Sequence, residues 1–575
     1  MNRTAAIVWS SFALFGAASA RPGGPTPVRP TRMVPLTRGT IAREFPDKHS
    51  AAELVALAKQ RQWKPSQNWI ATEGKRYGRL LIVSDLHPGP GTDPLTGKVH
   101  PVEAFMRDRQ EIDFRNMLTK EWQSSRADGR VRTLVLNGDV FEFMQVTTAP
   151  EGQKFTGGKD QYGPLNTPRN IITKLREIWE GHPDMFKAYA EHLVNGHRIV
   201  LLPGNHDRQL VHPAVRAALR SILKTEVARA IGADPTFQPA LTGEARHVAA
   251  IHQARTVLEE RFELHPHFFM VGDVFVRHGN QNDHSNSFST MLGDFYAHPL
   301  KRDQPMEAAL GDYFVKAVFN TVNAKIPWGK SEDNKLMVAH EALKKDHGRL
   351  FSAAKLLKAF VYIMTREGHG TPRDVTAQKV KEEEDLVRLV RQYGMVEKFN
   401  HLREGKAPLA EREVVDLLLE YQSKQAEPLL NTFQRGTGLV HRAFTALRRL
   451  PSLIKKIRGS AEQYEQAGNH FLFDQVGIKT VATGHDHLFR LERFVVGEPG
   501  KERLGQVLDD ATWLDAHPSP KARTVLAQLP ERRGVIAVDF DGAGSHSTLN
   551  HWDPVRHELL PVTVLEDMEE ALGKK

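Results

Sequence analysis

Five short runs of apolar residues, each ended by a cluster of polar side chains, constrain the fold of this chain more than any other feature of its sequence. Runs of this length that are rich in Val, Ile and Leu predict β-strands, and the amphipathic stretches between them predict helices. This alternation predicts an α/β fold. Because ligands bind beyond the carboxyl ends of the strands in open α/β sheets, we expect the five polar clusters to surround one site.

The polar clusters contain side chains that bind metal ions through nitrogen and oxygen. In chain order they supply Asp85 and His87; Asn137, Asp139 and Glu142; Asn205, His206 and Asp207; His278 and Asp283; and His485 and His487. The chain has no cysteine, which excludes disulfides, thiolate nucleophiles and cysteine-ligated zinc or iron–sulfur sites. Imidazole, carboxylate and amide ligands without thiolate suit divalent Mn, Fe or Zn.

The order of these motifs along the chain is more specific than any one of them. The series Asp-x-His, Gly-Asp, Gly-Asn-His-Asp, His-Gly and Gly-His-x-His resembles the calcineurin-like metallophosphoesterase superfamily over about residues 79–290 and 470–550. This resemblance implies two stacked β-sheets flanked by helices, an αββα sandwich, with a dinuclear metal centre between strand ends. The segment GDVFEF is most similar to the branch that hydrolyses UDP-2,3-diacylglucosamine, although that branch has arginine where this chain has His206.

The resemblance also implies a role for each motif residue. Asp85, His87 and His487 would bind one ion, Asn205, His278 and His485 would bind the second, and Asp139 would bridge them. Two divalent ions about 3.5–4 Å apart can clamp a phosphoryl group and hold a bridging hydroxide in line for attack. With only two carboxylates as ligands, the cluster keeps a positive charge of about +2, which favours an anionic substrate.

The residues that follow Asn205 are candidates for the proton transfer. Adjacent side chains near a strand end diverge, so His206 is expected to face the substrate and to protonate the leaving alkoxide. Asp207 is then expected to orient the imidazole or, alternatively, to cap the following turn. Arg208 is a candidate substrate contact.

The N-terminus predicts export. Residues 1–20 place Arg3 before an apolar run and offer Ala18-Ser19-Ala20 as a cleavage site, which is typical of a signal peptide and predicts a periplasmic or extracellular protein. The alternative is a disordered or buried N-terminus from a misassigned start, in a cytoplasmic protein. Residues 21–45 are rich in Pro and predict an extended linker. Elsewhere no run of about 18 apolar residues predicts a membrane span.

The two motif-bearing parts of the chain are separated by a long insertion. We predict a metallophosphoesterase domain over 75–294 and 471–565, ended by a last sheet strand in GVIAVDFD, and a helical insert over 295–470. Apolar spacing predicts helices within 348–364, 385–399 and 411–422. The insert would form either a cap over the metal centre or a self-packed helical subdomain.

Charge suggests the kind of partner. The net charge of +9 favours anionic partners, and residues 441–458 interleave basic and apolar side chains. That stretch predicts contact with an anionic lipid or membrane surface, or else a core helix with a basic rim. The expected function is hydrolysis of a phosphomonoester, phosphodiester or diphosphate, with a lipid-linked phosphate among the candidate substrates. The alternatives are a nuclease or nucleotide phosphodiesterase, or a noncatalytic binding protein on the same fold. Nucleic acid is the less favoured partner because the sequence has no motif that reads RNA or DNA.

Overall fold

The computed structural model describes most of the two motif-bearing parts of the chain and part of the insertion. The described residues are 34–38, 67–91, 103, 105, 107–146, 163–289, 292–320, 375–403, 407–426, 461, 463–485, 487, 489–496, 503–510, 512–513, 533–541 and 544–562. The predicted signal peptide, the helix predicted within 348–364 and the basic stretch 441–458 lie outside them. Among the described helices, none is both long and apolar enough to cross a membrane.

Thirteen strands form two sheets in the described part of the chain. In chain order they are β1 Val34–Arg38, β2 Arg79–Val83, β3 Arg132–Asn137, β4 Arg198–Leu202, β5 Phe262–Leu264, β6 Phe268–Val271, β7 Val274–Arg277, β8 Thr480–Thr483, β9 Phe489–Val496, β10 Arg503–Asp510, β11 Gly534–Asp541, β12 Gly544–Asp553 and β13 Glu558–Pro561. One sheet has seven strands in the order β13-β12-β11-β2-β3-β4-β5, and the other has six in the order β1-β9-β10-β8-β7-β6. Strands β2 to β5 are parallel to one another, as are β7, β8 and β10.

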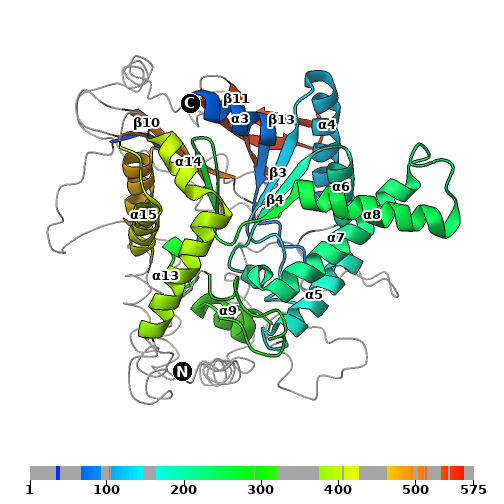
Figure 1. Cartoon of the computed structure of the whole chain (residues 1–575), viewed down its shortest axis with the longest axis horizontal. Helices are drawn as coiled ribbons and strands as arrows, with labels where there is room; N and C mark the ends of the chain where they lie inside the picture. Colours follow the sequence, from blue (N-terminus) through cyan, green and yellow to red (C-terminus); the bar gives the residue numbers. More distant parts are fainter. Residues whose placement is uncertain are drawn as a thin grey trace, which may run out of the picture.

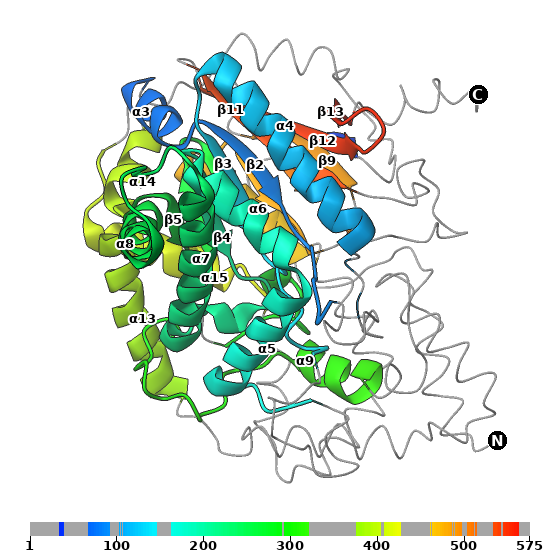
Figure 2. The same ribbon diagram turned by 90° about the vertical axis from the view of Figure 1, so that its right-hand side faces the viewer.

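Helices cover both outer faces of the two sheets (Figures 1 and 2). Against the seven-stranded sheet lie α4 Ile112–Asp128, α5 Pro168–Gly181, α6 Pro183–Val194, α7 Pro213–Ala233 and α8 Gly243–Arg261. Against the six-stranded sheet lie α13 Val375–Gln392, α14 Met395–Leu402 and α15 Glu411–Ser423. Two further helices are α3 Gln67–Tyr77 and α9 Leu310–Phe314. The expected α/β class is therefore confirmed, with two mixed sheets between helical layers.

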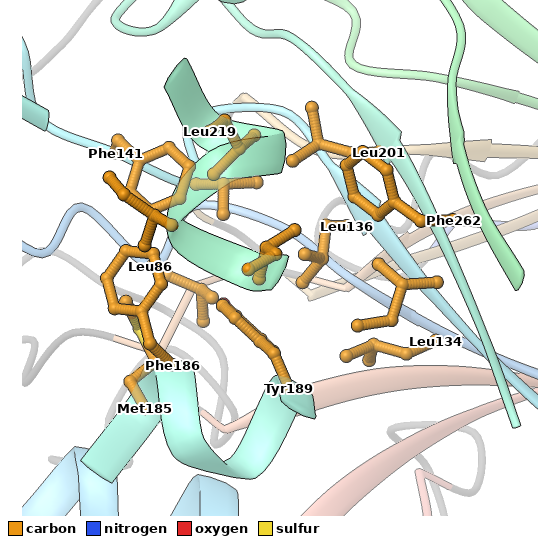
Figure 3. Close-up of a cluster of buried hydrophobic side chains, with 14 of the residues drawn as sticks. Leu86, Leu134, Leu136, Phe141, Met185, Phe186, Tyr189, Leu201, Leu219 and Phe262 are labelled. Carbon is orange, nitrogen blue, oxygen red and sulfur yellow. The ribbon is translucent and has the colours of Figure 1, made fainter. Parts of the chain in front are cut away.

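Alternation along the parallel strands explains why the predicted strands are almost uninterrupted apolar runs. Leu80 and Ile82 of β2 point into the core between the two sheets, whereas Leu81 and Val83 point into the core under the helices. A strand that is buried on both faces needs apolar residues at every position. Figure 3 shows part of the helix-side core, where Leu134 and the neighbouring strand residues face the aromatic side chains of α6.

Three strands lie where the sequence did not predict a strand. Residues 34–38, inside the predicted linker, form β1 and pair with β9 at the edge of the six-stranded sheet. The predicted last strand, β11, is followed by β12 and β13, which extend the seven-stranded sheet by antiparallel pairing. Of these, β1 and β13 are edge strands, which need fewer apolar residues than central ones, so their sequence signal is weak.

Three helices of the insertion lie against the outside of the six-stranded sheet. Helices α13, α14 and α15 share one apolar core with the six-stranded sheet, in which Leu389, Phe399 and Leu418 pack together with Phe275 and Val481. Figure 1 shows these helices on the opposite side of the sheets from α6 and α7. These three helices therefore form an outer layer on the six-stranded sheet.

Candidate metal centre

The ends of five strands meet between the two sheets and carry all of the predicted ligands. Backbone hydrogen bonds fasten the loops after β2 and β3, because Asp85 N donates to Gly138 O at 3.1 Å and His87 N donates to Asp139 O at 3.0 Å. A further bond, from Gly484 N to His278 O at 2.9 Å, joins the ends of β8 and β7. The convergence that the sequence predicted is therefore present.

Two clusters of metal-binding atoms form at this junction. Asp85, His87 and His487 make up one, and Asp139, His278 and His485 make up the other, with the ligand atoms of each within 4.8 Å of one another. In the first, His487 Nε2 lies 3.1 Å from Asp85 Oδ1. In the second, His278 Nε2 lies 3.3 Å from Asp139 Oδ2.

Asp139 lies between the two clusters. Its Oδ2 is also 3.6 Å from His87 Nε2, and it forms a further group with His87 and His206. The backbone beside Asn205 is packed on this carboxylate, because His206 N donates to Asp139 Oδ1 at 2.8 Å. At Gly204 a Cβ atom would lie 2.2 Å from the same oxygen, so only glycine permits this approach.

Several polar atoms of these residues are buried without a partner and could bind a metal ion. Asp85 Oδ1, Asn205 Oδ1 and His278 Nε2 are buried and have no hydrogen-bond partner among the described residues. Each such atom costs about 1–3 kcal/mol if nothing binds it. Unmatched oxygen and nitrogen atoms at three of the predicted ligands fit a metal centre.

The backbone at the ligands is strained. Seven non-glycine residues in the described part of the chain have positive φ, and five of them are predicted ligands: Asp85, His87, Asp139, His485 and His487. Residues with a Cβ atom adopt this conformation at a cost of about 1–3 kcal/mol each, and such residues gather at functional sites. The fold therefore holds these side chains in place at the expense of stability.

Burial and pairing shift the pKa values of these groups. Burial would raise the pKa of Asp85. The nearby His487 and His278 have the larger, opposite effect and hold this pKa well below its usual range. Burial would lower the pKa of His278, but Asp139 and Asp85 raise it to about 9. The carboxylates therefore carry negative charge that attracts cations to the site.

Glu142, and not Asp207, contacts the His206 imidazole. Glu142 Oε2 lies 2.7 Å from His206 Nδ1 and 3.1 Å from His87 Nδ1, so one buried carboxylate accepts from both rings. The Asp207 carboxylate instead accepts from the backbone N–H groups of Gly204, at 2.6 Å, and Val140, at 2.7 Å. Asp207 thus holds the loops after β4 and β3 together, and burial, with Asp139 nearby, raises its pKa to about 7.

Further contacts orient other ligands. His278 Nδ1 donates to Asn137 O at 2.9 Å, which leaves Nε2 for an ion. Asp283 Oδ2 lies 3.8 Å from His485 Nε2. Thr512 Oγ1 donates to Asp85 O at 2.8 Å, from the segment after β10.

Arg208, the candidate substrate contact, is buried. Its guanidinium lies 4.6 Å from the centre of the Phe288 ring.

The start of the insertion also reaches the loops that bear the ligands, since Gly311 N donates to Ser285 O at 2.8 Å and Asn320 Nδ2 donates to Met144 O at 2.9 Å.

The chain was compared with protein-family models, curated proteins and solved structures, and none of the three comparisons found a match.

Proposed function

We propose that this chain is a metal-dependent phosphoesterase that binds two divalent ions at the strand-end site and hydrolyses a phosphate ester or diphosphate. The observation that carries the proposal is the pair of ligand clusters joined at Asp139. A structural metal site is closed by its own ligands, whereas a shared carboxylate between two nitrogen-rich clusters suits a catalytic pair of ions. The motif order and the two-sheet sandwich support the metallophosphoesterase family as the particular class.

The ligands divide between two positions. Asp85, His87 and His487 would hold one ion, Asn205, His278 and His485 the other, and Asp139 both. When bound, the ions supply Lewis acidity toward the phosphoryl oxygens and lower the pKa of the water that attacks phosphorus. The neutral ligands keep the site positive overall, which suits a phosphate.

His206 is suited to deliver a proton to the leaving group. Glu142 accepts the Nδ1 proton of this ring, so Nε2 is the nitrogen left to face the reacting atoms. The ring stands perpendicular to that of His87, with ring centres 4.7 Å apart, which places it beside the ligands. The His206 side chain also keeps about 15% of its surface exposed, so a substrate can reach it.

A panel of phosphomonoesters, phosphodiesters and diphosphates, assayed with the manganese-loaded protein, tests the proposal. We expect hydrolysis of at least one class that stops on chelation and returns with added Mn²⁺. Two bound ions without turnover of any class would instead support a noncatalytic binding protein. Hydrolysis that survives both chelation and Asp139→Asn would contradict the proposed site.

A further inference from the structure

Two buried residues behind the ligand Asp85 have no part in the function proposed above. Ser84 immediately precedes Asp85, and Asp510 is the last residue of β10. The Ser84 Oγ atom lies 2.8 Å from Asp510 Oδ1 and is also hydrogen-bonded to Asp85 Oδ2. All three residues are completely buried.

The two oxygens of Asp85 have different surroundings. Oδ2 accepts from Ser84 Oγ and from the backbone N–H of His485, the latter at 2.9 Å. Oδ1 is the oxygen beside His487 and has no hydrogen-bond partner in the described part of the chain. Rotation of an aspartate carboxyl group about its last torsion is weakly restricted, so bonds to Oδ2 decide where Oδ1 points.

Packing around Ser84 leaves its hydroxyl little room. A Cβ atom at Gly484 would lie 2.3 Å from Ser84 Oγ and 2.7 Å from Asp85 Oδ2, so the loop before His485 closes over the hydroxyl. Asp510 comes from the neighbouring strand, since β10 pairs in parallel with β8 and Asp509 lies opposite Thr483. The ends of β2, β8 and β10 therefore meet at the Ser84 hydroxyl.

We propose that Asp510 is a positioning residue of the metal centre, which acts through the Ser84 hydroxyl to turn Asp85 Oδ1 toward the ion that Asp85, His87 and His487 hold. Asp510 itself touches neither ion nor substrate. The inference rests on the proposed function, because it needs that ion. Partners of this kind orient ligands and typically change metal affinity by about 10–100-fold when removed.

The test is manganese binding by Ser84→Ala, Asp510→Ala, Asp510→Asn and the double variant Ser84→Ala/Asp510→Ala, measured by titration calorimetry. Asn can both donate to and accept from the Ser84 hydroxyl, so it keeps the link that Ala removes. Gln506→Ala is the matched control, because Gln506 is a buried polar residue of the same strand that bonds Thr480 Oγ1. Circular dichroism and thermal melting establish that each variant keeps the fold.

We expect Ser84→Ala and Asp510→Ala each to weaken one of the two manganese sites by about 10–100-fold, and the double variant to lose no more than the worse single variant. Electron paramagnetic resonance should show the spin-coupled pair replaced by a single ion. Asp510→Asn and Gln506→Ala should bind as the wild type does.

Two results would overturn the inference: folded Asp510→Ala and Ser84→Ala proteins with wild-type affinity for both ions, or Asp510→Asn impaired as much as Asp510→Ala. Failure of the wild type to bind two ions would instead reject the proposed function itself.

Discussion

At the scale of single residues, Asp139 is the side chain on which both ions would depend. Its carboxylate joins the two clusters, and its neighbour Gly204 has no room for a side chain. We predict that Asp139→Asn weakens both sites by about 10–100-fold, whereas loss of any other ligand weakens mainly one. Equilibrium dialysis against Mn²⁺ with elemental analysis measures this. Asp553→Asn, at the end of β12, is the control, and retention of two ions by Asp139→Asn would contradict the bridging role.

His206 is the residue that we propose as the proton donor to the leaving group. We expect His206→Ala to reduce turnover by about 10²–10⁴ on esters with poor leaving groups and much less on nitrophenyl esters, which need little protonation. Steady-state kinetics on a leaving-group series checks this, with the exposed His546→Ala as control. An equal loss across the series would show that His206 binds substrate rather than donating a proton.

The site shows which residue roles a sequence can predict. Each predicted ligand lies at a strand end. These positions could be predicted because a buried strand is an apolar run in the sequence, and the strand ends where the run ends. The partner of His206 was predicted wrongly, because Asp207 is adjacent in sequence whereas Glu142 comes from the loop after another strand. The position of Glu142, three residues after Asp139, was the only available signal. The positive φ angles at the ligands have no sequence signal, since they occur at Asp and His rather than at Gly.

At the scale of elements, a buried ion network fastens the loop after β2 to helix α6. His182, just before α6, has Nε2 3.1 Å from Glu103 and Nδ1 3.0 Å from Glu111. Glu103 also accepts from Gly91 N at 2.6 Å, and Glu111 accepts from Met185 N, at 2.6 Å. Burial would lower the pKa of His182, but the two carboxylates raise it to about 9.

This network predicts a pH dependence of stability. Because the folded pKa of His182 lies above the unfolded value of 6.5, its stabilisation is complete below pH 6.5 and is lost as the pH rises through about 9. We expect the difference in unfolding free energy between wild type and His182→Gln to fall by about 3 kcal/mol between pH 6.5 and pH 10. Denaturant titrations of both proteins at the two pH values measure it. A difference that does not change with pH would contradict the charged state of His182.

The elements that the sequence predicted well are those whose signal is local. Strands β2, β3, β4, β7 and β8 and the helices around 385–399 and 411–422 each have their own apolar pattern. Strand β1 depends on pairing with β9, more than 450 residues away in the chain, and its own sequence includes Pro35. The apolar face of a helix also does not indicate which surface the helix packs against. Helices α13 to α15 could therefore be predicted as helices but not placed on the six-stranded sheet.

At the scale of the whole molecule, helices α13 to α15 of the insertion share a core with the six-stranded sheet and should unfold together with it. Phe399 of α14 is fully buried against the six-stranded sheet. We predict that Phe399→Ala lowers the unfolding free energy by about 3–5 kcal/mol and that the protein still melts in one transition, with loss of metal at the same temperature. Calorimetry checks this, with the exposed Val380→Ala of α13 as control. Separate transitions would show that the insertion is an independent subdomain.

Anomalous X-ray diffraction would locate the two divalent ions that we propose at the five strand ends, joined by Asp139. Crystals grown with Mn²⁺ and measured at the manganese absorption edge should show two anomalous peaks per chain. We predict that one peak lies among Asp85, His87 and His487 and that the other lies among Asn205, His278 and His485. The Asp139 carboxylate should lie between the two peaks, which should be about 3.5–4 Å apart. A single peak, or no peak at these residues under excess Mn²⁺, would contradict a two-ion centre at this site.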